Sequence, residues 1–585
     1  MVAAPARPPG GHGRGARRVG HRRVRGGDPQ GMGAPRPAGP DPGGASRRGG
    51  CAAGSRGRLV EDRSDVMTSP PPKRALDRGA LIPPREAPAP FPDSAFVAPD
   101  RALDVACHAL ERRSPAYSAR IVLVRWQRLL LVAGIVSSLA GLVFLPGPTG
   151  VVLVGLLAAF QLWALVFRLL VFRRGARGGR MRVTDEEARA VPESRLPTYT
   201  VLVPVFRKPR VEELIEALER IDYPRDKLDI RLVVEAGDTR TVAAAEALRP
   251  RAHLSVIRVP GADPRTKPKA CNYGLLTARG MLCTVFNAED RPDPLQLRKA
   301  VVALERLGPR YACVQARLGF HGPSRNLLAR WFTLEQEIRF GNLLPGLVDA
   351  SAPVPLGGTS SHFRVAALRA AGAWDPWNAT DDADLGVRLR RTGYRVGALD
   401  STTLAEPNPD PINWIKQRSR WYKGQLQTFL VHMRSPRLFA EQAGWRVVAD
   451  TTVLVAGGPL LGLLNGLFWI LTLTWFVPRD PIVAGLFPPL VHHLALLCLV
   501  AGNLSAMYVN LYAARVMGRP DLLVAALLSP GYWLLAGVAA VKAVVQLIRH
   551  PFRGKKKIHG FRADPGQQVV AEPPVGALTA RERVP

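Results

Sequence analysis

The feature that most constrains the fold is a run over residues 129–167 that contains no charged side chain. This run is about twice the ~20 residues that one helix needs to cross a lipid bilayer. Pro146, Gly147, Pro148 and Gly150 interrupt it near the middle, and a single long helix cannot carry such a cluster without breaking. The sequence therefore predicts a transmembrane hairpin over residues 126–173, in which two helices are joined by a tight turn.

Arginines follow this run and predict which side of the membrane its end faces. They are Arg168, Arg173, Arg174, Arg177, Arg180 and Arg182. Basic residues beside transmembrane helices favour the cytoplasmic side. We therefore expect this end of the hairpin in the cytosol, in a multi-pass protein of the cell inner (plasma) membrane that contacts membrane lipids.

Three further apolar blocks cover residues 451–478, 481–514 and 522–548, within a predicted set of C-terminal transmembrane helices over 446–548. A basic tail over 549–585 follows and is expected in the cytosol. An even number of crossings is then required, so one block should be re-entrant, interfacial or a hairpin. The candidate breaks are Gly457-Gly458-Pro459 and Ser529-Pro530-Gly531, and the sequence does not choose between them.

The formal net charge of +33 would suit a nucleic-acid-binding protein, but its distribution does not. Residues 1–66 hold 13 Arg and no Lys among Gly, Pro and Ala. With the Pro-rich stretch that follows, they predict a disordered region over residues 1–100, because they cannot bury an apolar core. Other basic residues border the apolar runs, as expected in a membrane protein. We therefore expect no nucleic-acid partner. After the predicted disordered region, a short helical segment is expected over 101–125.

The six cysteines are scattered through the chain. None forms a CxxC pair, and no Cys/His spacing matches a zinc site. This usage predicts structural thiols on a reducing cytosolic face rather than a disulfide framework.

Residues 190–440 have a different pattern, in which short apolar runs alternate with helix-like segments. The predicted strands cover 200–206, 230–235, 253–259 and 281–286, and 211–221 is one of the predicted helices. This alternation predicts an α/β domain with a Rossmann-like, mostly parallel sheet. Such sheets bind ligands at the carboxyl ends of their strands. We therefore expect a cytosolic ligand-binding domain inserted between α-helical transmembrane segments.

The first motif, Asn287-Ala288-Glu289-Asp290, directly follows a predicted strand. Acidic side chains at a strand end suit a divalent metal that bridges a diphosphate, because Mg²⁺ prefers hard oxygen ligands. A solvated acidic turn is the alternative.

The second motif, Thr380-Asp381-Asp382-Ala383-Asp384, leads into a helix-like run. An aspartate here could act as a general base that accepts the proton of an attacking hydroxyl. The same residues could instead cap the N-terminus of the helix. The spacing leaves both interpretations open.

The third motif is Gln417-Arg418-Ser419-Arg420-Trp421. Arginine can bind a diphosphate through two hydrogen bonds, and an indole offers a flat face on which a sugar ring can stack. An aromatic-basic belt at the membrane interface is the alternative, and it fits the isolated Trp445 better than this motif.

Other candidate residues support these motifs. They are Pro204 after the first strand, Glu235 and Asp238 after the second, and Lys267 and Lys269, which could meet phosphates as point charges. Gly357 and Gly358 supply permissive backbone where a ligand could approach closely. His362 alone is more typical of a structural histidine.

These motifs occur in a fixed order between two apolar blocks, and in that order the chain resembles the processive family 2 glycosyltransferases typified by cellulose, chitin and hyaluronan synthases. It is most similar to bacterial cellulose synthase-like members with the strings EADD, DAED, PLGGTSNHF, TEDADLG and QRSRWxKG. The resemblance runs from about residue 120 to about residue 561. It implies a GT-A fold, a nucleotide-sugar donor, Mg²⁺ or Mn²⁺, and inversion at the anomeric carbon.

The resemblance also implies a role for each matching residue. Asp382 would be the catalytic base, and Glu289 would be the metal ligand. The nucleotide sugar would be bound by Pro204, Glu235, Asp238, Lys269, Asn287 and Glu289. The diphosphate and the acceptor would be held by Asp381, Gln417, Arg420 and Trp421.

The predicted function is therefore that of a membrane-bound, metal-dependent hexosyltransferase that extends an exopolysaccharide-type acceptor. A glycolipid synthase that adds one sugar to a lipid acceptor is an alternative. So is a catalytically silent sugar- or nucleotide-binding partner of a polysaccharide synthesis complex. Two departures from the family strings motivate the silent partner: Asn287 replaces the first acid of DAED, and Gly237 replaces an acid in EADD.

Overall fold

The computed structural model describes residues 88–93, 97–206, 211–248, 251–321, 326–476, 481 and 489–551, all within the unit Gly79–Pro585. The predictions for residues 1–66 and for the tail beyond residue 551 lie outside these ranges. The predicted disordered region extends too far, because Phe91 is buried and its N–H donates to the carbonyl of Arg369 at 2.7 Å. The short helix predicted next is confirmed as α1 (Ala102–Arg113).

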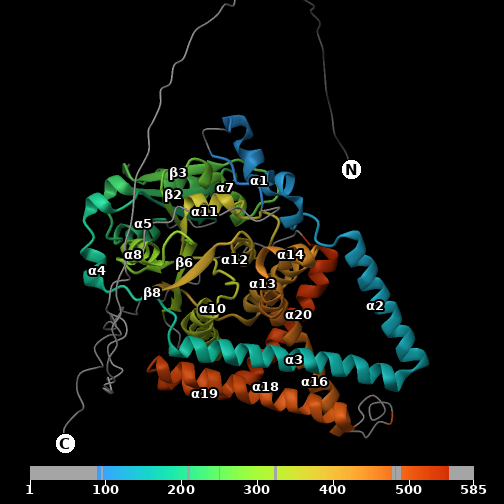
Figure 1. Cartoon of the computed structure of the whole chain (residues 1–585). Coiled ribbons are helices and arrows are strands. Elements are labelled where there is room, and N and C mark those ends of the chain that lie inside the picture. The colour runs from blue at the N-terminus through green and yellow to red at the C-terminus, as the bar shows by residue number, and fades with distance from the viewer. Residues whose placement is uncertain are drawn as a thin grey trace, which may run out of the picture. The chain divides into compact units, whose positions relative to one another are not determined.

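Eight strands form one mixed sheet in the order β3-β2-β1-β4-β7-β6-β8-β5 (Figure 1). The pairs β1–β2, β2–β3, β1–β4 and β6–β8 are parallel, which confirms the mostly parallel sheet and the predicted strands. β7 runs antiparallel to both of its neighbours, β4 and β6. The strands are β1 (Tyr199–Val205), β2 (Leu228–Glu235), β3 (Leu254–Val259), β4 (Leu282–Val285), β5 (Arg291–Pro292), β6 (Tyr311–Phe320), β7 (Ser361–Arg364) and β8 (Arg395–Ala405).

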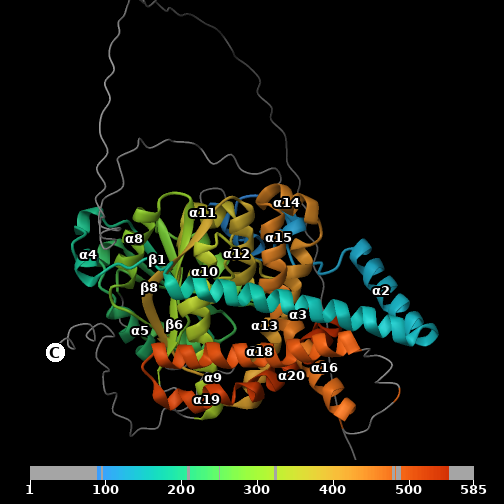
Figure 2. The same ribbon diagram turned by 60° about the horizontal axis from the view of Figure 1, so that its bottom comes forward.

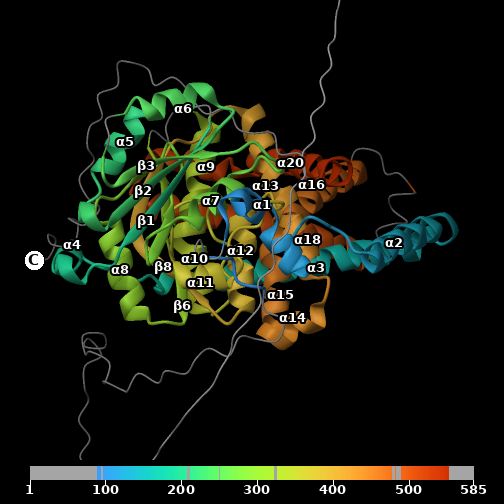
Figure 3. The ribbon, with the colours of Figure 1, turned by 90° about the horizontal axis from the view of Figure 1, so that it is seen from above.

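Helices cover both faces of the sheet, so the central strands are apolar on both sides. Along β1, Leu202 packs into one apolar cluster while Val201 and Val203 pack into the other, as the two-residue repeat of a strand requires. Figure 3 shows α6 near the β3 edge of the sheet, where it contacts β2 and β3, whereas α5 contacts β5. The helices of this domain are α4 (Asp185–Arg189), α5 (Glu212–Glu219), α6 (Thr239–Glu246), α7 (Lys267–Leu276), α8 (Gln296–Leu307), α9 (Leu327–Gln336), α10 (Leu344–Asp349), α11 (Val365–Ala370), α12 (Asp381–Arg391), α13 (Pro411–His432) and α14 (Pro436–Ala443).

The cysteines of the described residues are all free and buried, as expected for structural thiols, and Cys51 lies outside the described ranges. Cys271, Cys283 and Cys313 belong to the apolar cluster on one face of the sheet. They therefore act there as small apolar side chains.

Among the described residues, five helices are long and apolar enough to cross a membrane. The two helices of the predicted transmembrane hairpin correspond to α2 (Arg125–Phe144) and α3 (Pro146–Arg177). Pro146 begins α3, where its missing N–H costs no helical hydrogen bond. The remaining spans are Trp445–Leu473, which joins α15 (Trp445–Thr451) to α16 (Gly457–Phe476), His493–Val516 within α18 (Pro489–Val516), and Ser529–Arg549, which is α20.

The membrane hairpin is fixed to the sheet domain by a close contact between α3 and α10. A Cβ atom on Gly175 would lie 1.7 Å from the carbonyl oxygen of Asn342, and one on Gly346 would lie 1.9 Å from that of Val171. Only glycine permits this approach of two backbones. Figure 2 shows α3 running beside α18 beneath the sheet, whereas α2 projects away from it.

The C-terminal helices decide between the two candidate breaks. The chain remains helical through Gly457-Gly458-Pro459, where a π-helical segment, Thr452–Ala456, precedes α16, so this candidate is not a break. A π-helical turn accommodates the proline, which cannot donate to the preceding turn. Ser529-Pro530-Gly531 does begin a new helix, α20, after α19 (Leu523–Leu527).

Helix α20 lies along α13 of the sheet domain. The indole Nε1 of Trp414 donates to the hydroxyl of Tyr532 at 3.2 Å, and Nε2 of Gln427 donates to the carbonyl of Pro551 at 3.0 Å. The two helices therefore run in the same direction, and both ends of α20 contact the sheet domain.

Candidate active site

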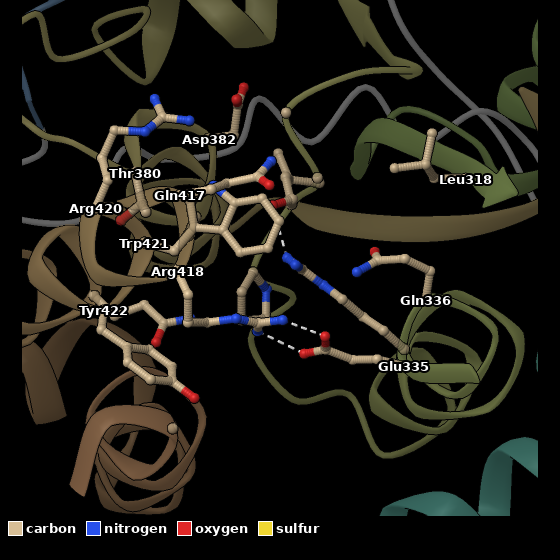
Figure 4. Close-up of a pocket in the computed structure, with 18 of the residues that line it drawn as sticks. Leu318, Glu335, Gln336, Thr380, Asp382, Gln417, Arg418, Arg420, Trp421 and Tyr422 are labelled. Atoms are coloured by element: carbon tan, nitrogen blue, oxygen red, sulfur yellow. Dashed lines mark hydrogen bonds and ion pairs between the residues drawn. The ribbon is translucent and has the colours of Figure 1, made fainter. Parts of the chain in front are cut away.

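A cavity of about 770 Å³ lies between the carboxyl edge of the sheet and the helices below it. Its lining includes Glu289, Asp382 and Trp421, which come from distant parts of the chain. Figure 4 shows Asp382, Gln417, Arg420 and Trp421 together in this pocket. The cavity continues between the membrane helices α3, α16, α18 and α20.

The ends of three neighbouring parallel strands supply one side of the cavity. Pro204 is the next-to-last residue of β1, Glu235 ends β2, and Asn287 and Glu289 follow β4. All four residues line the cavity. Parallel strands bring their carboxyl ends to one edge, which is why these separate segments converge.

Two of the predicted nucleotide-binding residues do not line the cavity. Asp238 caps α6, because it accepts hydrogen bonds from N–H of Thr241 at 3.4 Å and from its hydroxyl at 2.8 Å. Lys269 is fully buried, with its Nζ 3.2 Å from Oε1 of Glu235. Any influence of Lys269 on a ligand therefore passes through Glu235.

Lys267 is the lysine of this segment that lines the cavity. Two residues on a helix point about 200° apart, so Lys267 and Lys269 face different sides of α7. Lys267 Nζ donates to Oδ1 of Asn287 at 3.1 Å and to the carbonyl of Gly358. Burial alone would lower the pKa of Lys267, but the nearby acids, above all Asp382, raise it above its ordinary value, so the group is a cation at neutral pH.

Asp290 of the first motif has a shifted pKa. Burial, followed by the charge of Glu289, raises its pKa to about 7. Its Oδ2 accepts from the N–H of Asn287 at 2.7 Å and from the hydroxyl of Thr359. Its Oδ1 is buried and has no hydrogen-bond partner among the described residues.

These carboxylates fit a divalent cation. Glu289 lines the cavity, and a cation would provide the missing partner for Oδ1 of Asp290. No group of three or more His, Cys, Asp or Glu side chains in the described ranges could hold a metal by itself. Mg²⁺ is often bound by one or two carboxylates together with substrate phosphates, and this donor set matches that pattern.

Asp381 and Asp382 begin α12 and line the cavity. The side chain of Thr380 makes no capping hydrogen bond, so Thr380 does not cap this helix. Oδ1 of Asp382 accepts from Nε1 of Trp374 at 3.1 Å. Burial raises the pKa of Asp382, against the opposing charge of Lys267, and burial together with the charge of Asp382 raises the pKa of Asp381 well above its ordinary value.

The third acid of this motif has a different environment. Asp384 is fully buried, 2.7 Å from Nε of Arg388 and 3.0 Å from Nε2 of His432. Burial would raise its pKa, but these partners, Arg388 above all, lower it below its ordinary value. Asp384 therefore belongs to a buried ion network rather than to the cavity.

Helix α13 presents the third motif to the cavity, where Gln417, Arg420 and Trp421 all lie in the lining. Asp410 caps this helix by accepting from the N–H of Asn413 at 2.6 Å. Burial lowers the pKa of Arg420, although the charges of Asp381 and Asp382 oppose this shift. Trp445 is instead exposed, as expected for an isolated interfacial tryptophan.

The glycine-rich segment lies against the same aspartates. A Cβ atom on Gly357 would lie 2.8 Å from Cζ of Phe340, and one on Gly358 would lie 3.3 Å from Oδ2 of Asp382. His362 lies in the sheet, with Nδ1 2.7 Å from the hydroxyl of Tyr199, and burial lowers its pKa to about 3. It is structural.

The sequence did not point to Glu335 and Arg339, which also line the cavity, and Arg418 was part of the third motif without a role of its own. Glu335 belongs to α9, which carries no recognisable motif. The only hint in the sequence lies in α13, where the spacing of Trp414, Arg418 and Trp421 puts these three residues on one face of the helix.

Comparison with known proteins shows what the central domain is similar to. Residues 197–424 match the family model described as "Glycosyltransferase like family 2". This match covers less than half of the chain. The mixed sheet agrees with the predicted GT-A fold, inserted between apolar helices.

Curated relatives of this glycosyltransferase-like domain act on different acceptors by name. "Beta-monoglucosyldiacylglycerol synthase" of Synechocystis sp. (strain ATCC 27184 / PCC 6803 / Kazusa) is 26% identical over 46% of this chain and 57% of its own length. "Glucomannan 4-beta-mannosyltransferase 2" of Arabidopsis thaliana is 28% identical over 42% of this chain and 47% of its own length. The chain therefore spans about half the length of these relatives.

One solved structure is also similar to this chain. The mannosyltransferase PcManGT from Pyrobaculum calidifontis, in complex with GDP-Man and Mn²⁺, is 18% identical, with a TM-score of 0.40 over 67% of this chain and 99% of that chain. The matching family model is broader than the cellulose, chitin or hyaluronan synthase type that the motifs suggest.

Proposed function

We propose that this chain is a membrane-bound inverting glycosyltransferase that moves a sugar from a nucleotide-sugar donor to a growing polysaccharide. The observation that carries the proposal is the shared cavity of Glu289, Asp382 and Trp421, which extends from the sheet edge into the membrane helices.

The donor end of the site is the carboxyl edge of the sheet. Pro204, Glu235 and Asn287 would contact the nucleotide, and Lys267 and Arg420 would bind the diphosphate as fixed cations. Asp238 and Lys269, which the family resemblance adds, would support this pocket from behind.

Glu289, with Asp290, would hold Mg²⁺ or Mn²⁺. When bound, such an ion neutralises diphosphate oxygens and so stabilises the leaving group.

Asp382 would act as the general base, with its proton-accepting oxygens in the cavity. The acceptor oxygen attacks the anomeric carbon, its proton passes to Asp382, and the bond between that carbon and the phosphate oxygen breaks. One direct displacement inverts the anomeric configuration. Lys267 and Arg420 stabilise the charge that develops on the nucleoside diphosphate as it leaves.

The membrane part of the cavity favours a sugar chain over a lipid tail as the acceptor. Its lining includes four uncharged amides, Gln161, Asn465, Asn503 and Asn510. The buried Oε1 of Gln161 and Oδ1 of Asn503 have no partner among the described residues and could accept from sugar hydroxyls. Acyl chains offer no donors to such oxygens.

A glycolipid synthase is the second candidate, because one relative carries that name. In that case a single sugar would be added to a lipid. Product size separates the two candidates.

We further propose that the sheet domain faces the cytosol and that α20 lies in the membrane interface. Both ends of α20 contact α13, at Trp414 and at Gln427, so α20 would start and end on the cytosolic side. Only α16 and α18 would then cross after the sheet domain, which gives the even number that a cytosolic tail requires.

A panel of radiolabelled nucleotide sugars, supplied to membranes that contain the full chain with Mg²⁺ or Mn²⁺, tests the proposal. We expect one donor to yield a product of many sugars that is retained on a size column. A labelled lipid with a single sugar would favour the glycolipid synthase, and no transfer from any donor would support the silent partner.

A further inference from the structure

Three helices meet at a buried charged cluster below Trp421: Glu335 of α9, Arg418 of α13 and Tyr532 of α20. Arg418 binds the carboxylate of Glu335 through both terminal nitrogens, with Nη1 2.6 Å from Oε1. The hydroxyl of Tyr532 donates to Oε2 of Glu335 at 2.5 Å. In Figure 4, Trp421 lies between Asp382 and the Arg418–Glu335 pair.

The hydroxyl of Tyr532 uses its full hydrogen-bonding capacity in this cluster. Besides its donated bond, it accepts from Nη2 of Arg418 at 2.9 Å and from Nε1 of Trp414 at 3.2 Å. A tyrosine hydroxyl has one donor and acceptor lone pairs, so no replacement without an oxygen reproduces this junction.

The guanidinium of Arg418 is also surrounded by aromatic rings. Its carbon lies 4.8 Å from the ring centre of Trp414, 5.1 Å from that of Trp421 and 5.9 Å from that of Tyr532. A cation against an aromatic face attracts the ring, most strongly where water is excluded. Phe332 also lies beside the indole of Trp421, with 6.1 Å between the ring centres.

We propose that Arg418, held by Glu335 and Tyr532, is a positioning residue that fixes the indole of Trp421 for the acceptor sugar. This inference rests on the proposed function. Arg418 does not act on the reacting atoms; it sets the height and tilt of the platform on which the acceptor lies. Tyr532 ties that platform to α20, so the arrangement of the membrane-associated helices determines whether the acceptor is aligned.

The proposal predicts a selective defect. If Trp421 is loosened, the donor still binds and water can still attack it, since water needs no platform. Transfer to the acceptor falls, because a misaligned acceptor hydroxyl no longer lies in line with the anomeric carbon. The ratio of donor hydrolysis to sugar transfer should therefore rise.

Three variants of the full chain test this: Tyr532→Phe, Arg418→Lys and Glu335→Gln. The matched control is Tyr508→Phe, because Tyr508 of α18 is 63% exposed and lies outside the cavity. With the donor that the wild type uses, hydrolysis and transfer are measured in the same reaction, and affinity for the released nucleoside diphosphate is measured separately. A melting curve in detergent checks folding.

We expect Tyr532→Phe to raise the ratio of hydrolysis to transfer about tenfold, the effect of one well-placed buried hydrogen bond. Nucleoside diphosphate affinity should stay within about twofold of the wild type, as should both readouts in Tyr508→Phe. Arg418→Lys, which keeps the charge but loses the paired hydrogen bonds, should behave like Tyr532→Phe.

An unchanged ratio in Tyr532→Phe and Arg418→Lys would overturn the inference. So would an equal loss of hydrolysis, transfer and nucleotide affinity in all three variants, because that pattern indicates a general structural role. A wild type that transfers no sugar is a different result, since it contradicts the proposed function itself.

Discussion

Nζ of Lys267 donates a hydrogen bond of 3.1 Å to Oδ1 of Asn287. This contact joins the first turn of α7 to the position where the resembling enzymes carry the first acid of their DAED string. The amide orients the lysine without cancelling its charge, so a cation stays available in the cavity. The departure at Asn287 is therefore compatible with an active enzyme.

Replacing Asn287 tests that interpretation. In Asn287→Asp, the added carboxylate should pair with Lys267 and also attract a cation, so the Mg²⁺ concentration that gives half-maximal transfer should fall, by about threefold to tenfold. Asn287→Ala should leave the metal requirement unchanged. A wild type without activity that gains it in Asn287→Asp would instead support the silent partner.

The two lysines of α7 should give different defects. Lys267→Gln removes a cation from the leaving-group side of the cavity, and kcat/KM should fall about 10²-fold while the melting temperature holds. Lys269→Gln leaves Glu235 buried without its ion-pair partner and should chiefly lower the melting temperature. The reverse pattern would return the diphosphate role to Lys269.

The sequence was sufficient for the first four strands and for the two helices of the hairpin, because periodicity and uncharged length are local properties, but β5, β6, β7 and β8 were not predicted. The sequence did not predict which side chains point into the cavity. Lys267 and Lys269 differ by two residues, yet only Lys267 reaches the cavity. The sequence also left two candidate breaks open, and the helix continues through Gly457-Gly458-Pro459 because a π-helical turn accommodates the proline.

Long-range pairing was beyond the sequence. Glu335 and Arg418 are ordinary helical residues in the sequence, and only tertiary packing brings them into contact. The same holds for the contact of Phe91 with the sheet domain, which shortens the predicted disordered region.

The raised pKa of Asp290 predicts a pH-dependent stability. Its folded pKa, about 7, exceeds the ordinary 3.8, so its stabilising contribution is complete below pH 3.8 and is lost as the pH rises through about 7. Asp290→Asn removes the charge. In EDTA, its melting temperature should exceed that of the wild type at pH 8 by a few degrees, and this difference should be smaller at pH 5. Equal differences at both pH values would contradict the shift.

The contact between α3 and α10 should be intolerant of any side chain. Gly346→Ala would place Cβ 1.9 Å from the carbonyl oxygen of Val171, so we expect a loss of about 3 kcal/mol or more in stability. The control is Gly155→Ala, because Gly155 lies in α3 with open space around it. Thermal unfolding in detergent measures both, and similar melting temperatures would show that the hairpin is not fixed there.

The most direct test of the account compares the wild type with Asp382→Asn in the full chain, using the donor that the wild type transfers. We predict that Asp382→Asn binds the nucleoside diphosphate with wild-type affinity, melts at the wild-type temperature and loses at least about 10³-fold in transfer, since its general base is gone. Transfer by Asp382→Asn at the wild-type rate would contradict the account.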